Sequence, residues 1–235
     1  KEYIKKIVQV FISLIIKILK THRFGWFVID SFFKKITNLQ LIVKNNKGFK
    51  LYFYSPNKIT KYRIDTFFSK EPETLKWIDN FDDHSVFFDV GANVGLYSCY
   101  AAMSKKVKTY AFEPSVFNLE ILAKNIYKNK LDQLITIIPL ALDEKRKISN
   151  FNMSSTEVGG ALSTFDKQFT HDGTNINKKI SYKTLGISLD ELINFYNLPK
   201  PQFIKIDVDG LEHFILKGSD KTLDTTKSIL VEIDE

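Results

Sequence analysis

The chain has 235 residues, of which 44% are hydrophobic, and this is enough apolar surface for a sizeable buried core. Its net charge is +7, but residues 1–23 alone contribute +5, from six Lys and Arg residues against one Glu. The rest of the chain therefore carries only +2. This distribution argues against a nucleic-acid-binding groove on the main domain.

The cysteine and histidine contents argue against disulfides and against a zinc site. The single cysteine, Cys99, cannot form an internal disulfide, so we expect a reducing compartment, the cytoplasm. The four histidines are scattered, and none has metal-ligand spacing to a cysteine or to another histidine: His22, His84, His171 and His213. We therefore predict no metal. The oligomeric state stays open.

Residues 4–19 predict a helix that is apolar almost all round. Its polar residues recur every four positions and form one narrow stripe: Lys5, Gln9, Ser13 and Lys17. The uninterrupted apolar part is shorter than the roughly 20 residues that a bilayer span needs. Two alternatives stay open. Residues 1–23 could lie on the inner membrane surface with their lysines at the headgroups. The helix could instead pack on the domain or on a second copy.

The next segments predict a hairpin and a helix. Residues 39–54 alternate in the manner of two β-strands around Asn45-Asn46-Lys47-Gly48. Pro72 and the acidic residues beside it start a helix over 69–81. We group residues 1–60 as an appendage of helix and hairpin, and we assign residues 61–235 to one α/β domain. Because the chain does not begin with methionine, a segment before it stays open.

From residue 85 onward, predicted strands and helices alternate. The strands are predicted over 85–90, 106–114, 134–142, 201–210 and 228–235. Helices are predicted over 92–103, from the cap Ser115, over 189–197 after a capping box at Ser188 and Glu191, and from Leu211. Residues 147–185 predict an irregular insert with two short strands around 157–165. Because the main strands are apolar throughout, we expect a buried, mostly parallel, doubly wound sheet.

The stretch "FFDVGANVG", residues 87–95, ends the first of these strands in a glycine loop. In such sheets, ligands bind at the carboxyl ends of the strands. Gly91 and Gly95 allow a tight turn and close packing of the following helix. A dinucleotide fingerprint needs a middle glycine beside the pyrophosphate, but Asn93 stands there and Asp89 lies next to it. The loop thus favours a ligand with a cationic, amino-acid-like end.

The second strand adds a candidate ribose ligand. Glu113 follows Gly91 by about 20 residues, where an acid typically accepts hydrogen bonds from ribose hydroxyls. A ribose and a cationic group without a diphosphate describe S-adenosylmethionine. The two glycines alone are also explained by an ordinary strand–helix turn. Their conjunction with Asp89, Glu113 and the acidic end of the fourth strand favours the cofactor.

These stretches resemble the FkbM family of S-adenosylmethionine-dependent methyltransferases. The matching segments are "EPETLKWI", "FFDVGANVGLYS", "AFEPS", "ALDE", "GGALS", "FIKIDVDGLEHFILKG" and "ILVEID". The family pattern usually has glutamate at the position of Asp209. The resemblance implies a Rossmann-like class I methyltransferase fold and methylation of a hydroxyl on a sugar, glycolipid or polyketide-type acceptor. Because this fold normally carries two more strands, we expect the chain to lack its last two.

The resemblance also implies a set of cofactor-binding residues along the carboxyl edge of the sheet: Asp89, Gly91, Asn93, Gly95, Glu113, Ala141, Leu142 and Asp207. The first four would line the methionine end of S-adenosylmethionine. Glu113 would hold the ribose, and Ala141 and Leu142 would lie near the adenine.

The end of the fourth strand supplies the catalytic candidates. Methyl transfer is an in-line displacement in which placing the acceptor oxygen matters most, and a sugar hydroxyl gains from a general base. We predict that Asp207 lines the reaction site and that His213 or Glu212 acts as the base. Glu212 could instead only favour a helix start, and His213 could be an ordinary packed or exposed side chain.

Three alternatives concern the loop and the function. The Gly159-Gly160 pair could form a mobile loop over the substrate or an ordinary turn. A nicotinamide-dependent oxidoreductase is a rival function, which Asn93 weakens. A non-catalytic binding protein with a degenerate fold is the second rival.

Overall fold

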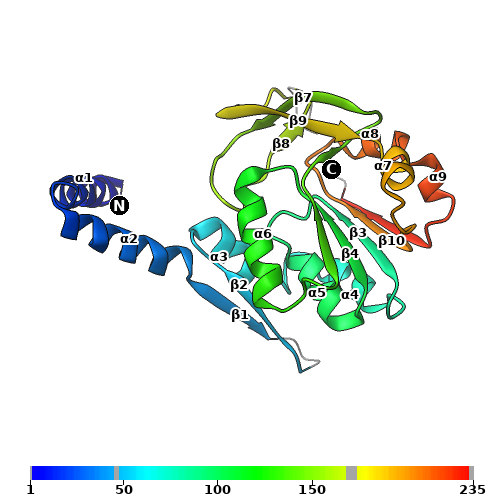
Figure 1. Cartoon of the computed structure of the whole chain (residues 1–235), viewed down its shortest axis with the longest axis horizontal. Helices are drawn as coiled ribbons and strands as arrows, with labels where there is room; N and C mark the ends of the chain where they lie inside the picture. The colour runs from blue at the N-terminus through cyan, green and yellow to red at the C-terminus, as the bar shows by residue number, and fades with distance from the viewer. Residues whose placement is uncertain (1, 45–47, 168–173, 233–235) are drawn as a thin grey trace. The chain divides into compact units, whose positions relative to one another are not determined.

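A computed structural model of the chain describes residues 2–44, 48–167 and 174–232 (Figure 1). The chain divides into two compact units, Lys1–Gln40 and Leu41–Glu235.

The first unit consists of two helices, α1 (Glu2–Leu19) and α2 (Arg23–Thr37). The helix predicted over 4–19 is confirmed, whereas α2 is a finding of the structure. Its glycine, aromatic and β-branched residues are weak helix formers, so propensity gives little sign of it. None of the helices in the described part of the chain combines the length and the hydropathy needed to span a bilayer.

The predicted hairpin is confirmed as a two-stranded sheet of β1 (Gln40–Lys44) and β2 (Lys50–Tyr54). Of the turn predicted at 45–48, residues 45–47 lie outside the described residues. Whereas the sequence groups this hairpin with the N-terminal helix, its side chains Val43, Leu51 and Phe53 are buried in the core of the second unit. The alternation along β2 turns one face of the strand toward that core.

Within the described residues, the main sheet has five parallel strands in the order β11-β10-β3-β4-β5. They are β3 (Val86–Val90), β4 (Lys108–Phe112), β5 (Ile135–Ile138), β10 (Phe203–Ile206) and β11 (Ser228–Val231). The first strand in sequence thus lies in the middle, and later strands are added on both sides of it. This confirms the buried, parallel, doubly wound sheet.

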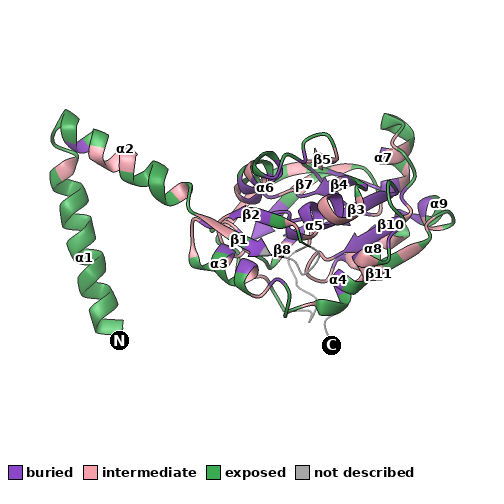
Figure 2. Cartoon of the chain, turned by 90° about the horizontal axis from the view of Figure 1, so that it is seen from below, coloured by how far each residue is buried: buried purple, intermediate pink, exposed green. Residues whose placement is uncertain are grey.

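Helices cover both faces of this sheet (Figure 1). The helices of the second unit are α3 (Lys58–Asp65), α4 (Pro72–Asp79), α5 (Leu96–Lys105), α6 (Val116–Lys128), α7 (Leu189–Tyr196), α8 (Glu212–Lys217) and α9 (Asp220–Leu223). Successive residues of β3 pack against the helices on opposite faces of the sheet. Phe87 packs in the core with α5 and α6, and Phe88 packs in the core with α7 and α8. Figure 2 shows the buried strands between these layers.

The strand predicted over 134–142 is wrong, because the structure divides it in two. β5 belongs to the main sheet, while β6 (Ala141–Leu142) pairs with β9 (Ile180–Ile187) in a second sheet. Pro139 lies between them. Since proline has no N–H to donate to a ladder, it ends the pairing of β5.

The described residues of the insert over 147–185 contain three strands, whereas the sequence predicts two short strands around 157–165 in an irregular segment. β7 (Lys147–Met153) pairs antiparallel with β8 (Ser163–Phe165) and with β9, and the second sheet has the order β6-β9-β7-β8. The segment "KISNFNM" of β7 carries Lys, Ser and Asn, which have little strand propensity. Long-range pairing with β9 therefore overrides the local signal.

Candidate active site

Two cavities lie at the carboxyl edge of the main sheet. The larger has a volume of about 90 Å³ and is lined by polar groups that include Gly91, Asn93, Glu113, Asp207 and Asp209. The smaller has a volume of about 40 Å³ and a mostly apolar lining that includes Ala141, Leu142 and Phe165. Gly91 and Val208 line both cavities, so the two are adjacent parts of one site.

The glycine loop holds three residues in the left-handed region: Gly91 (φ +82°), Asn93 (φ +51°) and Gly95 (φ +82°). A Cβ on Gly91 would lie 1.8 Å from the carbonyl oxygen of Asp207. A Cβ on Gly95 would lie 2.4 Å from Leu122 Cδ1, so this glycine serves the contact between α5 and α6. Because of this backbone, α5 begins only at Leu96, and the helix start predicted at residue 92 is wrong.

Glu113 lies at the end of β4 with its carboxylate fixed by three donors. Its Oε2 accepts from the backbone N–H of Asn93 at 2.7 Å. Its Oε1 accepts from the Ser115 N–H at 2.8 Å and from Asn118 Nδ2 at 3.3 Å. Ser115 occupies the N-cap of α6, as predicted, but its side chain makes no capping hydrogen bond. Burial raises the pKa of Glu113 to about 7, although these hydrogen bonds oppose the shift.

Two buried oxygen atoms near the loop have no hydrogen-bond partner within the described ranges: Asp89 Oδ1 and Asn93 Oδ1. Asn93 lines the larger cavity, and its Nδ2 donates to the carbonyl of Gly160 at 3.0 Å. Asp89 is a buried residue of β3 that lines neither cavity, and Ser98 donates to its other oxygen. Burial raises the pKa of Asp89, and the Lys205 ammonium opposes that shift.

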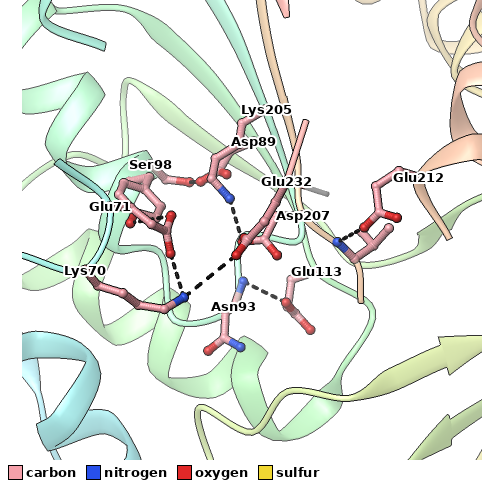
Figure 3. A network of polar contacts seen from close by, with 12 residues as sticks. Lys70, Glu71, Asp89, Asn93, Ser98, Glu113, Lys205, Asp207, Glu212 and Glu232 are labelled. Carbon is pink, nitrogen blue, oxygen red and sulfur yellow. Dashed lines mark hydrogen bonds and ion pairs between the residues drawn. The ribbon is translucent and has the colours of Figure 1, made fainter. Parts of the chain in front are cut away.

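A charged cluster borders the larger cavity, at the ends of β10 and β11 and the start of α4 (Figure 3). Lys205 is 1% exposed, and its Nζ lies 2.6 Å from Asp207 Oδ2. One carboxylate oxygen each of Glu71, Asp207 and Glu232 lie within 4.8 Å of one another. Lys70 Nζ lies 2.7 Å from Glu71 and 3.9 Å from Glu232.

The carboxyl groups of Asp207 and Glu232 in this cluster have pKa values shifted in opposite directions. Burial alone would raise the pKa of Asp207, but the Lys205 ammonium outweighs it and holds that pKa below its ordinary value. Burial and the neighbouring Asp207 raise the pKa of Glu232 to about 7. A carboxyl group with this pKa exchanges its proton near neutral pH.

The structure separates the predicted catalytic residues. Asp207 lines the larger cavity, whereas the residues lining the two cavities include neither Glu212 nor His213. Glu212 Oε1 accepts from the N–H groups of Val208 and Gly210, each at 3.1 Å. His213 is exposed, with its ring 4.0 Å from that of Phe214. Gly95 is likewise absent from both linings.

The turn at Gly159-Gly160 is hydrogen-bonded to residues of several other segments. Its backbone receives hydrogen bonds from Asn93 and from Arg63, whose Nε donates to the Gly159 carbonyl at 2.7 Å. The Gly159 N–H donates to Asn118 Oδ1 at 2.8 Å. Arg63 lies on α3 and lines the larger cavity, yet no sequence motif marks it. The sequence does not predict Lys205 and Glu232 as site residues either, because each occurs in a strand-like segment without a motif.

Comparison with known proteins gives the chain its relatives. The family model of the methyltransferase FkbM domain matches residues 89–235. The hexuronic acid methyltransferase AglP of Haloferax volcanii is 29% identical over 157 residues, which are 66% of this chain and 59% of AglP. The chain thus spans less than two thirds of that relative's length.

Solved structures of methyltransferases are more remote. The precorrin-6Y C5,15-methyltransferase of Geobacter metallireducens is 16% identical, with a TM-score of 0.40 over 68% of this chain and 60% of that one. An rRNA methylase of Streptococcus thermophilus is 14% identical, with a TM-score of 0.39 over 68% and 69%.

The residues at the site fit S-adenosylmethionine. Glu113 presents a fixed carboxylate, and Asn93 presents a buried acceptor without a partner in the described part of the chain. The apolar cavity beside Ala141 and Leu142 suits a purine ring. The strand order and the helix layers are those of a class I methyltransferase fold. By the match over residues 89–235, more than half of its length, the chain belongs to the FkbM family of S-adenosylmethionine-dependent methyltransferases.

Proposed function

We propose that the chain transfers the methyl group of S-adenosylmethionine to a hydroxyl oxygen of a sugar acceptor of the hexuronic acid class. The observation that carries this proposal is a pair of neighbouring carboxyl groups: Asp207 lines the larger cavity, and one oxygen of Glu232 lies within 4.8 Å of one oxygen of Asp207. Such a pair can take the proton that a hydroxyl acceptor must give up. The sugar class comes from AglP, which is described as a hexuronic acid methyltransferase. Family membership makes the nicotinamide-dependent alternative wrong.

In this proposal, the cofactor residues have separate tasks. Glu113 accepts hydrogen bonds from the ribose hydroxyls, and Ala141 with Leu142 contacts the adenine. Gly91 and Asn93 border the methionine end, while Asp89 supports the loop. Gly95 acts through packing on Leu122 rather than by touching the cofactor.

We place the general base at the Asp207–Glu232 pair rather than at Glu212 or His213. Lys205 holds Asp207 ionised, so the exchangeable proton resides on Glu232. Once Glu232 has released this proton to solvent, a hydroxyl beside the pair can pass its own proton to the Glu232 carboxylate as the methyl group arrives. Glu212 is already engaged by two backbone N–H groups, and His213 is turned to solvent.

Replacing Glu113 with alanine should weaken binding of S-adenosylhomocysteine by about 10- to 100-fold, because hydrogen bonds to a charged group are lost. Isothermal titration calorimetry of the wild type and the variant measures this change. Glu120→Ala, an exposed glutamate on α6, is the matched control and should bind as the wild type does. Equal affinity of the Glu113 variant, or no binding by the wild type, would contradict the cofactor assignment.

Methyl transfer to a hexuronic acid glycoside should depend on pH through Glu232. The pKa of Glu232 is about 7, so its basic form grows as the pH rises through that value. We therefore expect kcat at saturating cofactor to rise from pH 6 to 8 and then level off. Mass spectrometry of the product gives kcat at each pH, and NMR identifies the methylated oxygen.

Two variants test the assignment of the base. Glu232→Gln should lower kcat by about 10²- to 10⁴-fold and remove the pH dependence. His213→Ala should keep the rate and the profile of the wild type. A normal profile in Glu232→Gln would move the base elsewhere. Cofactor binding without turnover on any hydroxylated acceptor would favour the non-catalytic alternative.

A further inference from the structure

The first unit exposes an unusual amount of apolar surface. From Tyr3 to Ile18, every apolar side chain of α1 is at least 40% exposed. The five aromatic side chains of α2 are all at least 53% exposed. Gly25 is the one buried residue among the described residues of both helices, and its surroundings are the backbone of Leu19. Figure 2 shows the exposed surface along both helices. Large exposed apolar patches of this kind mark sites of interaction.

The residues of α1 divide into two faces. At 100° per residue, Lys5, Gln9, Lys17 and their polar neighbours fall on one side, and isoleucine, valine and phenylalanine cover the wider remainder. An 18-residue helix is about 27 Å long, but α1 lacks the continuous hydropathy of a bilayer span. A helix with this division lies along an interface between water and an apolar phase.

The charge of the first unit indicates which partner binds this surface. Residues 1–40 contain eight Lys and Arg residues against two acidic residues, which accounts for +6 of the chain's net +7. A second copy would bring the same positive charge to the contact. A bilayer with anionic headgroups would instead attract each lysine and arginine. Trp26 is of a residue type that lies at the headgroup level, and Phe27 is of a type that forms the buried face of interfacial helices.

We propose that α1 and α2 together form a surface that binds the face of a bilayer containing anionic lipids. The apolar sides of the helices enter the headgroup region, and the basic side chains remain at its surface. The proposal extends over both helices and is independent of the reaction at the other unit.

Flotation with vesicles tests this on the whole chain. We expect binding to vesicles of phosphatidylcholine with phosphatidylglycerol, and much weaker binding to phosphatidylcholine alone or at high salt. Lys5→Gln with Lys6→Gln and Lys17→Gln should weaken binding by about tenfold or more. Phe24→Ser with Phe27→Ser should weaken it comparably. Phe195→Ser with Tyr196→Ser removes two similarly exposed rings from α7 and should change nothing.

Several results would overturn the proposal. These are equal binding to neutral and anionic vesicles, unchanged binding by both helix variants, or no binding at all. Self-association in light scattering that Phe24→Ser with Phe27→Ser abolishes, without vesicle binding, would assign the surface to a second copy. Methyl transfer to a soluble acceptor should be the same in all these variants, so a failure here is distinct from a failure of the proposed function.

Discussion

Replacing Gly91 with alanine is expected to abolish cofactor binding and to destabilise the second unit by about 2–4 kcal/mol. The added Cβ would lie 1.8 Å from the carbonyl oxygen of Asp207. It would also force a side chain into a backbone conformation with φ of +82°. Because Gly91 and Asp207 both line the larger cavity, relief of the overlap must move one wall of the site.

Gly48→Ala is the matched control, because Gly48 has a φ of +89° but, apart from its chain neighbours, no described atom within 4 Å of its Cβ position. It should cost only about 1 kcal/mol, the conformational part alone, and should leave binding of S-adenosylhomocysteine unchanged. Urea denaturation gives the free energy of unfolding of both variants, and calorimetry gives the affinity. Equal behaviour of the two variants would show that the close approach to Asp207 has no consequence.

The sequence predicts well where local chemistry decides the structure. Pro72 starts α4 as expected, and the Ser188 side chain accepts from the Glu191 N–H at the start of α7. The apolar run before Gly91 forms the central strand of the sheet. These features depend on residues within a few positions of one another, so periodicity and capping rules can predict them.

The sequence predicts poorly where distant segments meet. β7 carries polar residues and forms a strand because β9 pairs along its whole length. The polar residues around the site are likewise difficult to predict from the sequence, because they come from distant segments. Arg63 enters the larger cavity from α3, and Glu232 joins Asp207 only because β11 lies beside β10. Residue types reveal such partners only after the strand order is known.

Lys205 is the clearest case of a residue whose role depends on its surroundings. It stands in the apolar strand β10, opposite Asp89 in the parallel register, and its Nζ pairs with Asp207. Lys205→Met is expected to destabilise the second unit by about 3 kcal/mol at pH 7. We take the lower end for breaking a buried ion pair, because Asp207 is 32% exposed while Lys205 is buried.

The sign of the pH dependence follows from the same charges. Without the ammonium, the pKa of Asp207 is no longer held low, and the pKa of Asp89, which burial already raises, should rise further. A carboxyl group whose pKa is higher in the folded state than in the unfolded state destabilises the fold as the pH rises through that folded pKa. The variant should therefore recover stability as the pH falls and the carboxyl groups take up protons. Urea denaturation across the acidic to neutral range measures this recovery.

The double variant Lys205→Met with Asp207→Asn separates electrostatics from packing. If the loss in Lys205→Met comes from an uncompensated carboxylate, removing that charge should restore a large part of the stability at pH 7. If the loss comes from the shape of the lysine side chain, the double variant should be at least as unstable as the single one. Recovery of stability without recovery of turnover would then indicate that the charge of Asp207 serves the reaction, and that Lys205 is buried in β10 to keep this carboxylate ionised beside Glu232.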